Sequence, residues 1–203
     1  MARTVDPEKH AARRAAILGA AATVFAEKGY DAATTADVHR AAGVGSGTLF
    51  HYFPDKDTLF RALFEADRPL LEAVVGEVEA LPPVEALWRL VDHLVADVDD
   101  PLAPGLMVAA LSRALRDEGF AEILVDADEL AMRCLAGIIR RGQADGVVRA
   151  DLEPARASRW VHAQVDALYF MCGDEDFDAE AERRELRDVV TRYLGLSSWG
   201  RTT

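Results

Sequence analysis

The sequence predicts an all-α protein of about nine helices. Apolar residues recur every three or four positions through most of the 203 residues, which is the spacing of amphipathic helices. Strand patterns are scarce: no stretch sustains an alternation of apolar and polar residues, and Asp145-Gly146 follows a helical run instead of joining two β-branched runs. Half of the residues are hydrophobic and 29% are charged, a balance typical of a globular protein. We therefore expect helices packed around a sizeable core.

The N-terminal part is expected to contain three helices and the start of a longer fourth. The first ends where the chain reaches Gly29. Thr34 and Asp37 have the spacing of a capping box at the start of the second helix, and Gly43 should end it in the left-handed conformation. Pro54 breaks the third helix, after which the next residue can cap the fourth. The expected ranges are 7–28, 34–42, 46–53 and 56–80.

Five further helices are expected in the rest of the chain. Prolines mark the start of two of them, at Pro83 and Pro154, where the missing N–H is not needed. The polar stretch 173–178 separates the last two helices. These five helices contain residues 84–94, 107–114, 120–144, 157–168 and 186–194.

The lengths of the apolar runs and the cysteine pattern bear on the cellular compartment of the protein. No stretch approaches the roughly 18 uninterrupted apolar residues of a membrane span, and the first residues lack the apolar region of a signal peptide. We expect a cytoplasmic protein without a membrane partner. Cys134 and Cys172 each lie in an apolar helical run with no second Cys or His at ligand spacing, so we expect small buried hydrophobes. A redox role for either thiol stays open.

The segment from residue 34 to 56 carries the most specific pattern. Two short helices joined by a glycine-containing turn form a helix-turn-helix candidate. The segment reads TTADVHRAAGVGSGTLFHYFPDK, which closely resembles the DNA-binding segment of TetR-family regulators. Residues 20–30, AAATVFAEKGY, resemble the first helix of that family. The resemblance covers roughly a quarter of the chain and is specific, because several residue types recur at fixed offsets.

The resemblance implies a ligand-responsive transcriptional regulator. We expect a repressor, with activation left open. Residues 1–55 would form the helix-turn-helix DNA-binding domain, and residues 56–203 a larger helical domain for ligand binding and dimerisation. A homodimer would bind a pseudo-palindromic operator in double-stranded DNA and be released by a small hydrophobic effector of unknown identity. No cofactor is expected.

Seven residues of the helix-turn-helix segment are expected to contact DNA. Ser46, Thr48 and His51 are expected to reach base edges in the major groove. The other hydroxyl groups suit phosphate oxygens, as does the ammonium group of Lys56, and a glycine lets the DNA backbone approach closely. Alternatively, Thr35 and Ser46 are only helix caps, and the tyrosine is only part of the core. The expected contacts are Thr35, Ser46, Gly47, Thr48, His51, Tyr52 and Lys56.

Some features favour a different function. The chain has His39, Gly45 and Phe50 where the family commonly has Ala, Ser and Tyr. Residues 1–60 carry seven basic and seven acidic side chains, so the net charge of −12 arises beyond residue 60. The helix-turn-helix domain, here called the head, can still bind DNA without a net positive charge if its basic groups share one face. The alternative function is a helical ligand-binding or scaffold protein whose head no longer binds DNA.

Two sets of residues are expected to serve the larger domain, although either could be ordinary core. A ligand pocket is expected from Trp88, Met107, Leu111, Cys134, Ile138, Trp160 and Gln164. A dimer interface on the last two helices is expected from Trp160, Val161, Val165, Leu168, Val189, Val190 and Tyr193. His162 and Asp166 stand four apart on a helix, but without a third ligand we expect an ordinary pair and no metal site. No catalytic motif occurs, so we do not expect an enzyme.

Overall fold

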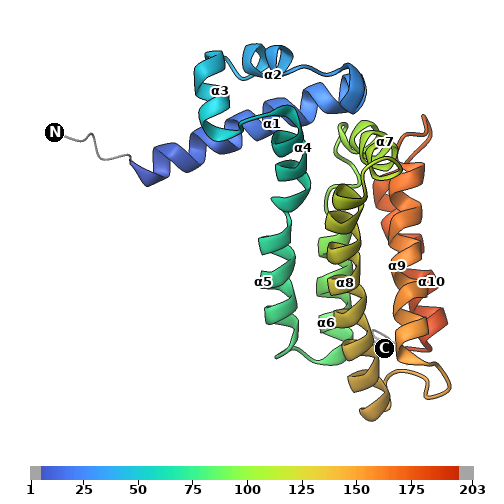
Figure 1. Cartoon of the computed structure of the whole chain (residues 1–203). Helices are drawn as coiled ribbons and strands as arrows, with labels where there is room; N and C mark the ends of the chain where they lie inside the picture. Colours follow the sequence, from blue (N-terminus) through green and yellow to red (C-terminus); the bar gives the residue numbers. More distant parts are fainter. Residues whose placement is uncertain (1–5, 197–203) are drawn as a thin grey trace. The chain divides into compact units, whose positions relative to one another are not determined.

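The computed structural model describes residues 6–196, and within that range the chain forms ten α-helices and no strand. The predicted all-α fold is confirmed. The helices belong to two compact units, coloured along the chain in Figure 1. Within the described range, the first unit contains residues 6–67 and 104–123, and the second contains residues 68–103 and 124–196. The predicted functional boundary between residues 55 and 56 stays a prediction, because compactness does not test it.

The first unit is built on a long helix. Its elements are α1 (Pro7–Ala32), α2 (Thr35–Ala41), α3 (Ser46–Tyr52), α4 (Lys56–Glu65), α7 (Ala103–Ala114) and the first turns of α8 (Glu118–Ala144). The side chain of Asp6 caps α1 by accepting hydrogen bonds from Glu8 N and Lys9 N. The helix runs four residues past its expected end, with a kink at Gly29, whose φ is 70°. Figure 1 shows α2 and α3 lying against α1.

A buried aromatic cluster holds the first unit together. Phe25 on α1, Phe60 on α4 and Phe120 on α8 are each fully buried. The ring of Phe60 lies 4.8 Å from that of Phe25 and 5.0 Å from that of Phe120, centroid to centroid. Such ring pairs stabilise a core beyond their area of burial. Residues 104–123 are therefore part of the same core as the N-terminal helices.

The predicted fourth helix is wrong as a single element. The structure divides residues 56–80 into α4 (Lys56–Glu65) and α5 (Arg68–Val78). Pro69 explains the division, because proline cannot donate an N–H and its ring collides with the carbonyl four residues earlier in a continuous helix. The break falls where the chain leaves the first unit at Asp67.

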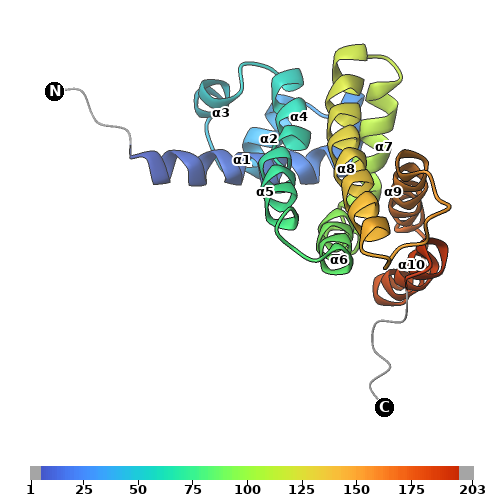
Figure 2. The same cartoon turned by 90° about the horizontal axis from the view of Figure 1, so that it is seen from below.

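The second unit packs five helices around a second core. It contains α5, α6 (Pro83–Leu94), the rest of α8, α9 (Pro154–Met171) and α10 (Ala179–Leu194). Figures 1 and 2 both show α9 and α10 side by side. Arg141 on α8 closes the C-terminal end of α5 by donating hydrogen bonds to the carbonyls of Val78 and Glu79, at 2.9 and 2.8 Å. Between residues 6 and 196 no helix has the length and apolar character to cross a membrane.

Candidate nucleic-acid interface

The turn between α2 and α3 follows local rules. Thr34 caps α2 and exchanges hydrogen bonds with Asp37 in a full capping box. Gly43 has φ of 62°, the left-handed conformation that glycine adopts without strain. Hydrogen bonds from Lys28 and Thr34 lower the pKa of Asp37 to about 2. The start of the helix-turn-helix is therefore held by a carboxylate that stays ionised at any physiological pH.

Helix α3 exposes several of the residues expected to contact DNA. Leu49 is fully buried and anchors the helix in the head. Ser46, Gly47 and His51 are exposed, whereas Thr48 is half-buried. The residue that caps α3 is Gly45, which offers no side chain, and Thr35 follows the cap of α2. The alternative that Thr35 and Ser46 are helix caps is therefore wrong.

A ring cluster that we did not predict lies beside α3. His10 on α1 packs against Tyr52, with ring centroids 4.5 Å apart, and against His51, at 6.2 Å. Tyr52 is half-buried, so it is partly packed and partly available. Arg14, also on α1, lies over the ring of the buried Phe53 at 5.2 Å. The half-buried His10 and the exposed Arg14 thus place α1 beside the C-terminal end of α3. No local pattern indicates this contact, because it joins residues about forty positions apart.

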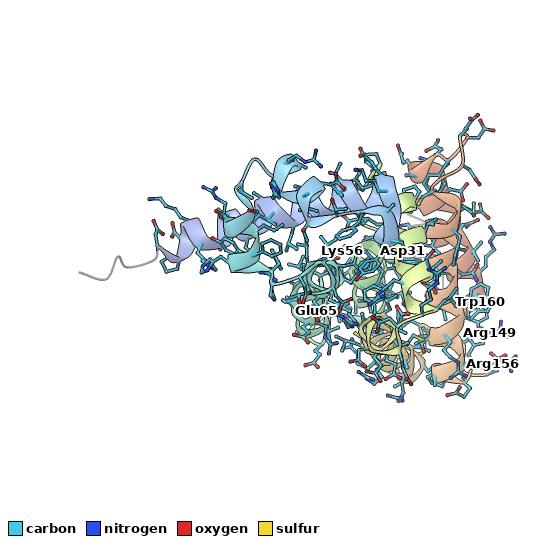
Figure 3. All side chains as sticks on the ribbon, turned by 45° about the horizontal axis from the view of Figure 1, so that its top comes forward. Asp31, Lys56, Glu65, Arg149, Arg156 and Trp160 are labelled. Atoms are coloured by element: carbon cyan, nitrogen blue, oxygen red, sulfur yellow. The ribbon has the colours of Figure 1, made fainter. Side chains whose placement is uncertain are left out.

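Lys56 is engaged inside the first unit. Its ammonium group donates to the carbonyls of Tyr30 and Ala33, at 2.8 and 3.1 Å, and lies 4.4 Å from the centre of the Tyr30 ring. Figure 3 shows Lys56 close to Asp31, whose carbonyl it also reaches, at 3.4 Å. This residue joins the start of α4 to the end of α1. In the structure Lys56 therefore contacts the protein's own carbonyl groups. Its predicted contact with a DNA phosphate stays a prediction.

An ionic network, also not predicted, links α4 to the α7–α8 turn. Arg61 donates to Asp57 and to Asp117, each at 2.6 Å. Arg113 on α7 donates to Asp57 at 2.8 Å and also to Asp117. Burial raises the pKa of Asp117, but the hydrogen bond from Phe120 N and the two guanidinium groups outweigh burial and hold it below its usual range. Each arginine contacts both aspartates, so every remaining group keeps a partner if one charge is removed. The network as a whole fixes residues 113–120 against α4.

The residues of the predicted ligand pocket are divided between the two units. Met107 and Leu111 belong to the first unit, whereas the other five belong to the second. Trp88 is buried, with the guanidinium of Arg187 over its ring at 4.7 Å. Cys134 and Ile138 do lie together, in a groove between α5 and α8. Burial raises the pKa of the Cys134 thiol, and of the Cys172 thiol, which leaves less of the reactive thiolate.

The predicted dimer residues divide between core and surface. The structure buries four of them in the core of the chain itself: Val161, Val165, Leu168 and Val190. Trp160 on α9 and Tyr193 on α10 are half-buried and stack on each other, with ring centroids 3.9 Å apart. Figure 3 shows Trp160 and Arg156 on the outer side of α9. The part of the predicted set that a partner could reach is therefore Trp160, Val189 and Tyr193.

His162 lies between two carboxylates in the second unit. Its Nδ1 lies 3.2 Å from Asp166 on the same helix, and its Nε2 lies 3.6 Å from Asp128 on α8. Burial lowers the pKa of His162, but the hydrogen bond and charge of Asp166, with the charge of Asp128, outweigh burial and raise it. For the carboxyl group of Asp128, burial is the largest effect and raises the pKa. Among the described residues, no group of three or more His, Cys, Asp or Glu side chains is placed to hold a metal ion.

Replacing His162 with glutamine should flatten the pH dependence of stability. A raised pKa in the folded state means that the protonated imidazole stabilises the fold below the unfolded value of about 6.5, and that this stability is lost as the pH rises through the folded pKa. Urea unfolding between pH 6 and 8.5 should therefore show the wild type gaining stability over His162→Gln as the pH falls. Equal slopes for His162→Gln and wild type would refute the coupling.

Comparison with known proteins identifies the family. Residues 17–63 match the family model of bacterial regulatory proteins, tetR family. The chain is 36% identical over 150 residues to the HTH-type transcriptional repressor Rv1474c of Mycobacterium tuberculosis, a match that covers 70% of this chain and 73% of that protein. It is 26% identical over 189 residues to the HTH-type transcriptional regulator UidR of Escherichia coli, with 91% and 94% covered.

Solved structures agree on the fold. Salmonella enterica GusR superposes with a TM-score of 0.67 and 26% identity, covering 90% of this chain and 95% of that one. A TetR transcription regulator from Haloarcula marismortui superposes with a TM-score of 0.77 and 22% identity, covering 91% and 97%. The predicted family is confirmed. The chain belongs to the TetR family of DNA-binding transcriptional regulators.

Proposed function

We propose that this chain is a repressor that binds a pseudo-palindromic operator as a homodimer and leaves it when a small hydrophobic effector binds. The observation that carries the proposal is helix α3, which is anchored by Leu49 after the Gly43 turn and exposes Ser46, Gly47 and His51. A helix presented in this way fits the major groove of DNA. The relative from M. tuberculosis, named a repressor, supports repression.

The contacts to DNA would come from one surface of the head. Ser46, Thr48 and His51 would reach base edges, and Thr35 and Tyr52 would bind phosphates through their hydroxyl groups. Gly47 would allow the DNA backbone to approach. The contact set would be Thr35, Ser46, Gly47, Thr48, His51 and Tyr52, with Lys56 holding α4 in place beside it.

The homodimer would form on the outer surfaces of α9 and α10. Trp160, Val189 and Tyr193 are only partly covered by the chain itself, and Phe170 near the end of α9 is 64% exposed. Two such helix pairs related by a two-fold axis form a four-helix bundle. Residues 1–55 would then bind DNA and residues 56–203 would bind effector and partner, with residues 104–123 fixed to the head by their shared core.

The test is binding to DNA from immediately upstream of the chain's own gene, titrated against salt. We expect tight binding, two chains per site, that weakens steeply as salt rises, because phosphate contacts release counterions. Replacing His51 with alanine should lower the affinity for that site about tenfold and leave binding to scrambled DNA almost unchanged, because a base contact carries sequence information. His93→Ala, a histidine of the second unit, should bind like the wild type.

The same titration tests the alternative function. If DNA from upstream of the gene and from adjacent promoters binds no better than scrambled DNA, the head does not recognise an operator. The chain would then be a ligand-binding or scaffold protein whose head no longer binds DNA. Equal binding to every DNA, with no effect of His51→Ala, would also contradict the proposed base contacts of α3.

A further inference from the structure

A groove in the second unit combines an apolar floor with a basic rim. It lies between the C-terminal half of α5 and the C-terminal half of α8, and its volume is about 370 Å³. Small-molecule sites occupy roughly 300–1,000 Å³, so the groove is large enough for a small ligand. Val75 of α5 and Cys134 of α8 line it as half-buried side chains, while Val78 and Ile138, which also line it, are already buried in the core. An aliphatic chain would remove the exposed parts of Val75 and Cys134 from water.

The charge of the groove is opposite to that of its surroundings. Beyond residue 60 the chain carries 16 basic and 28 acidic side chains. The groove is lined by three arginines, Arg133, Arg140 and Arg141, and by one carboxylate, Glu79. Arg133 also pairs with Glu129 on the same helix, at 2.9 Å. Arg141 is held in place by the carbonyls at the end of α5, so a positive charge is fixed at the groove before any ligand arrives. Guanidinium groups bind carboxylates in a planar, two-point arrangement.

Gly137 keeps part of the groove free of a side chain. A glycine inside a helix is unfavourable, because it orders a flexible residue without adding a contact. At Gly142 of the same helix the reason is internal packing, since a Cβ there would lie 2.5 Å from Val148 Cγ2. At Gly137 a Cβ would meet nothing within 4 Å, although the residue lines the groove and is half-buried. No contact within the chain requires this glycine, and its effect is to leave the groove floor open.

We propose that the groove between α5 and α8 is the effector site of this regulator and that its ligand is an aliphatic carboxylate. The chain of the ligand lies on Val75 and Cys134 over the backbone of Gly137, and the carboxylate meets Arg133 and Arg140 at the rim. The role as effector rests on the proposed function, whereas the binding itself does not.

Isothermal titration calorimetry of the full chain with decanoate, below its micelle concentration, tests the ligand class. Affinity should rise about two- to fourfold for each methylene from hexanoate to decanoate, because each added group covers apolar surface. Arg133→Gln with Arg140→Gln should weaken decanoate at least tenfold. Decyltrimethylammonium, which has the same chain and the opposite charge, should bind much more weakly. Equal binding of both amphiphiles, or of acetate and decanoate, would overturn the assignment.

Filling the groove tests the location. Gly137→Leu should abolish decanoate binding while the circular dichroism spectrum stays that of a folded helical protein, because the added side chain enters open space. Gly76→Leu is the matched control: this glycine is also unobstructed, is exposed on α5 and does not line the groove, so binding should persist. Decanoate should also slow alkylation of Cys134 by iodoacetamide and leave Cys172 unchanged. Undiminished binding to Gly137→Leu would place the ligand elsewhere and refute the proposal.

Operator release separates this inference from the proposed function. Decanoate should weaken operator binding by the wild type and have no effect on Gly137→Leu. If decanoate binds in the groove but operator affinity does not change, the effector role is wrong. If the chain binds no operator at all, the proposed function fails, and calorimetry still decides whether the groove takes aliphatic carboxylates.

Discussion

Replacing Phe60 with alanine should lower the free energy of unfolding of the first unit by about 3–5 kcal/mol. The Phe60 side chain is fully buried, and its ring lies within 5.1 Å, centroid to centroid, of four other aromatic rings: Phe25, Tyr30, Phe64 and Phe120. Alanine would remove these contacts and leave a cavity at the junction of α1, α4 and α8. Since a whole domain is stable by only about 5–15 kcal/mol, this loss is a large fraction of the stability of the first unit.

Urea unfolding followed by far-UV circular dichroism measures this loss, and operator affinity should fall with the fraction of folded head. Phe50→Ala is the matched control for stability. Phe50 is 47% exposed on α3, so its replacement should change the free energy of unfolding by no more than about 0.5 kcal/mol. A urea midpoint for Phe60→Ala equal to that of Phe50→Ala would show that the aromatic cluster does not hold the first unit together.

The parts of the head that follow local rules could be predicted from the sequence. The capping box of Thr34 and Asp37 and the left-handed Gly43 depend on residues within a few positions of each other. The helix-turn-helix was therefore predictable with its register. Pro69 is also a local signal, and it indicates that residues 56–80 form two helices. The apolar spacing on both sides of that proline nevertheless favoured one long helix.

Contacts between distant residues could not be predicted in this way. Helical periodicity shows which residues share a face, but it does not show what covers that face. Val161 and Val165 form an apolar stripe that fits a dimer interface, and the structure buries both in the chain's own core. Lys56 has the composition of a phosphate contact, yet carbonyl groups some twenty-five residues earlier hold its ammonium group. No local sequence pattern indicates that Phe120 packs with Phe60.

Gly105 is a further position whose role only the structure reveals, and Gly105→Ala should destabilise the first unit by about 1–3 kcal/mol. Gly105 lies in the first turn of α7, where a Cβ would lie 2.3 Å from the carbonyl oxygen and 2.8 Å from the carbonyl carbon of Ala26 on α1. These are backbone atoms, which cannot rotate away as the end of a flexible side chain can. The added methyl group must therefore push α7 away from α1, so that α7 loses packing on both sides of the contact.

The opposite result at another glycine makes this prediction specific. Gly19 lies inside α1, is exposed, and would meet nothing within 4 Å if a Cβ were added. Gly19→Ala should stabilise the same unit by roughly 0.5–1 kcal/mol, because alanine loses less conformational freedom in a helix. Urea unfolding of the two single variants therefore compares the same chemical change at a closed and an open position. If Gly105→Ala is as stable as Gly19→Ala, the close approach of α7 to α1 does not exist in solution, and residues 104–123 are not fixed to the head by packing at this point.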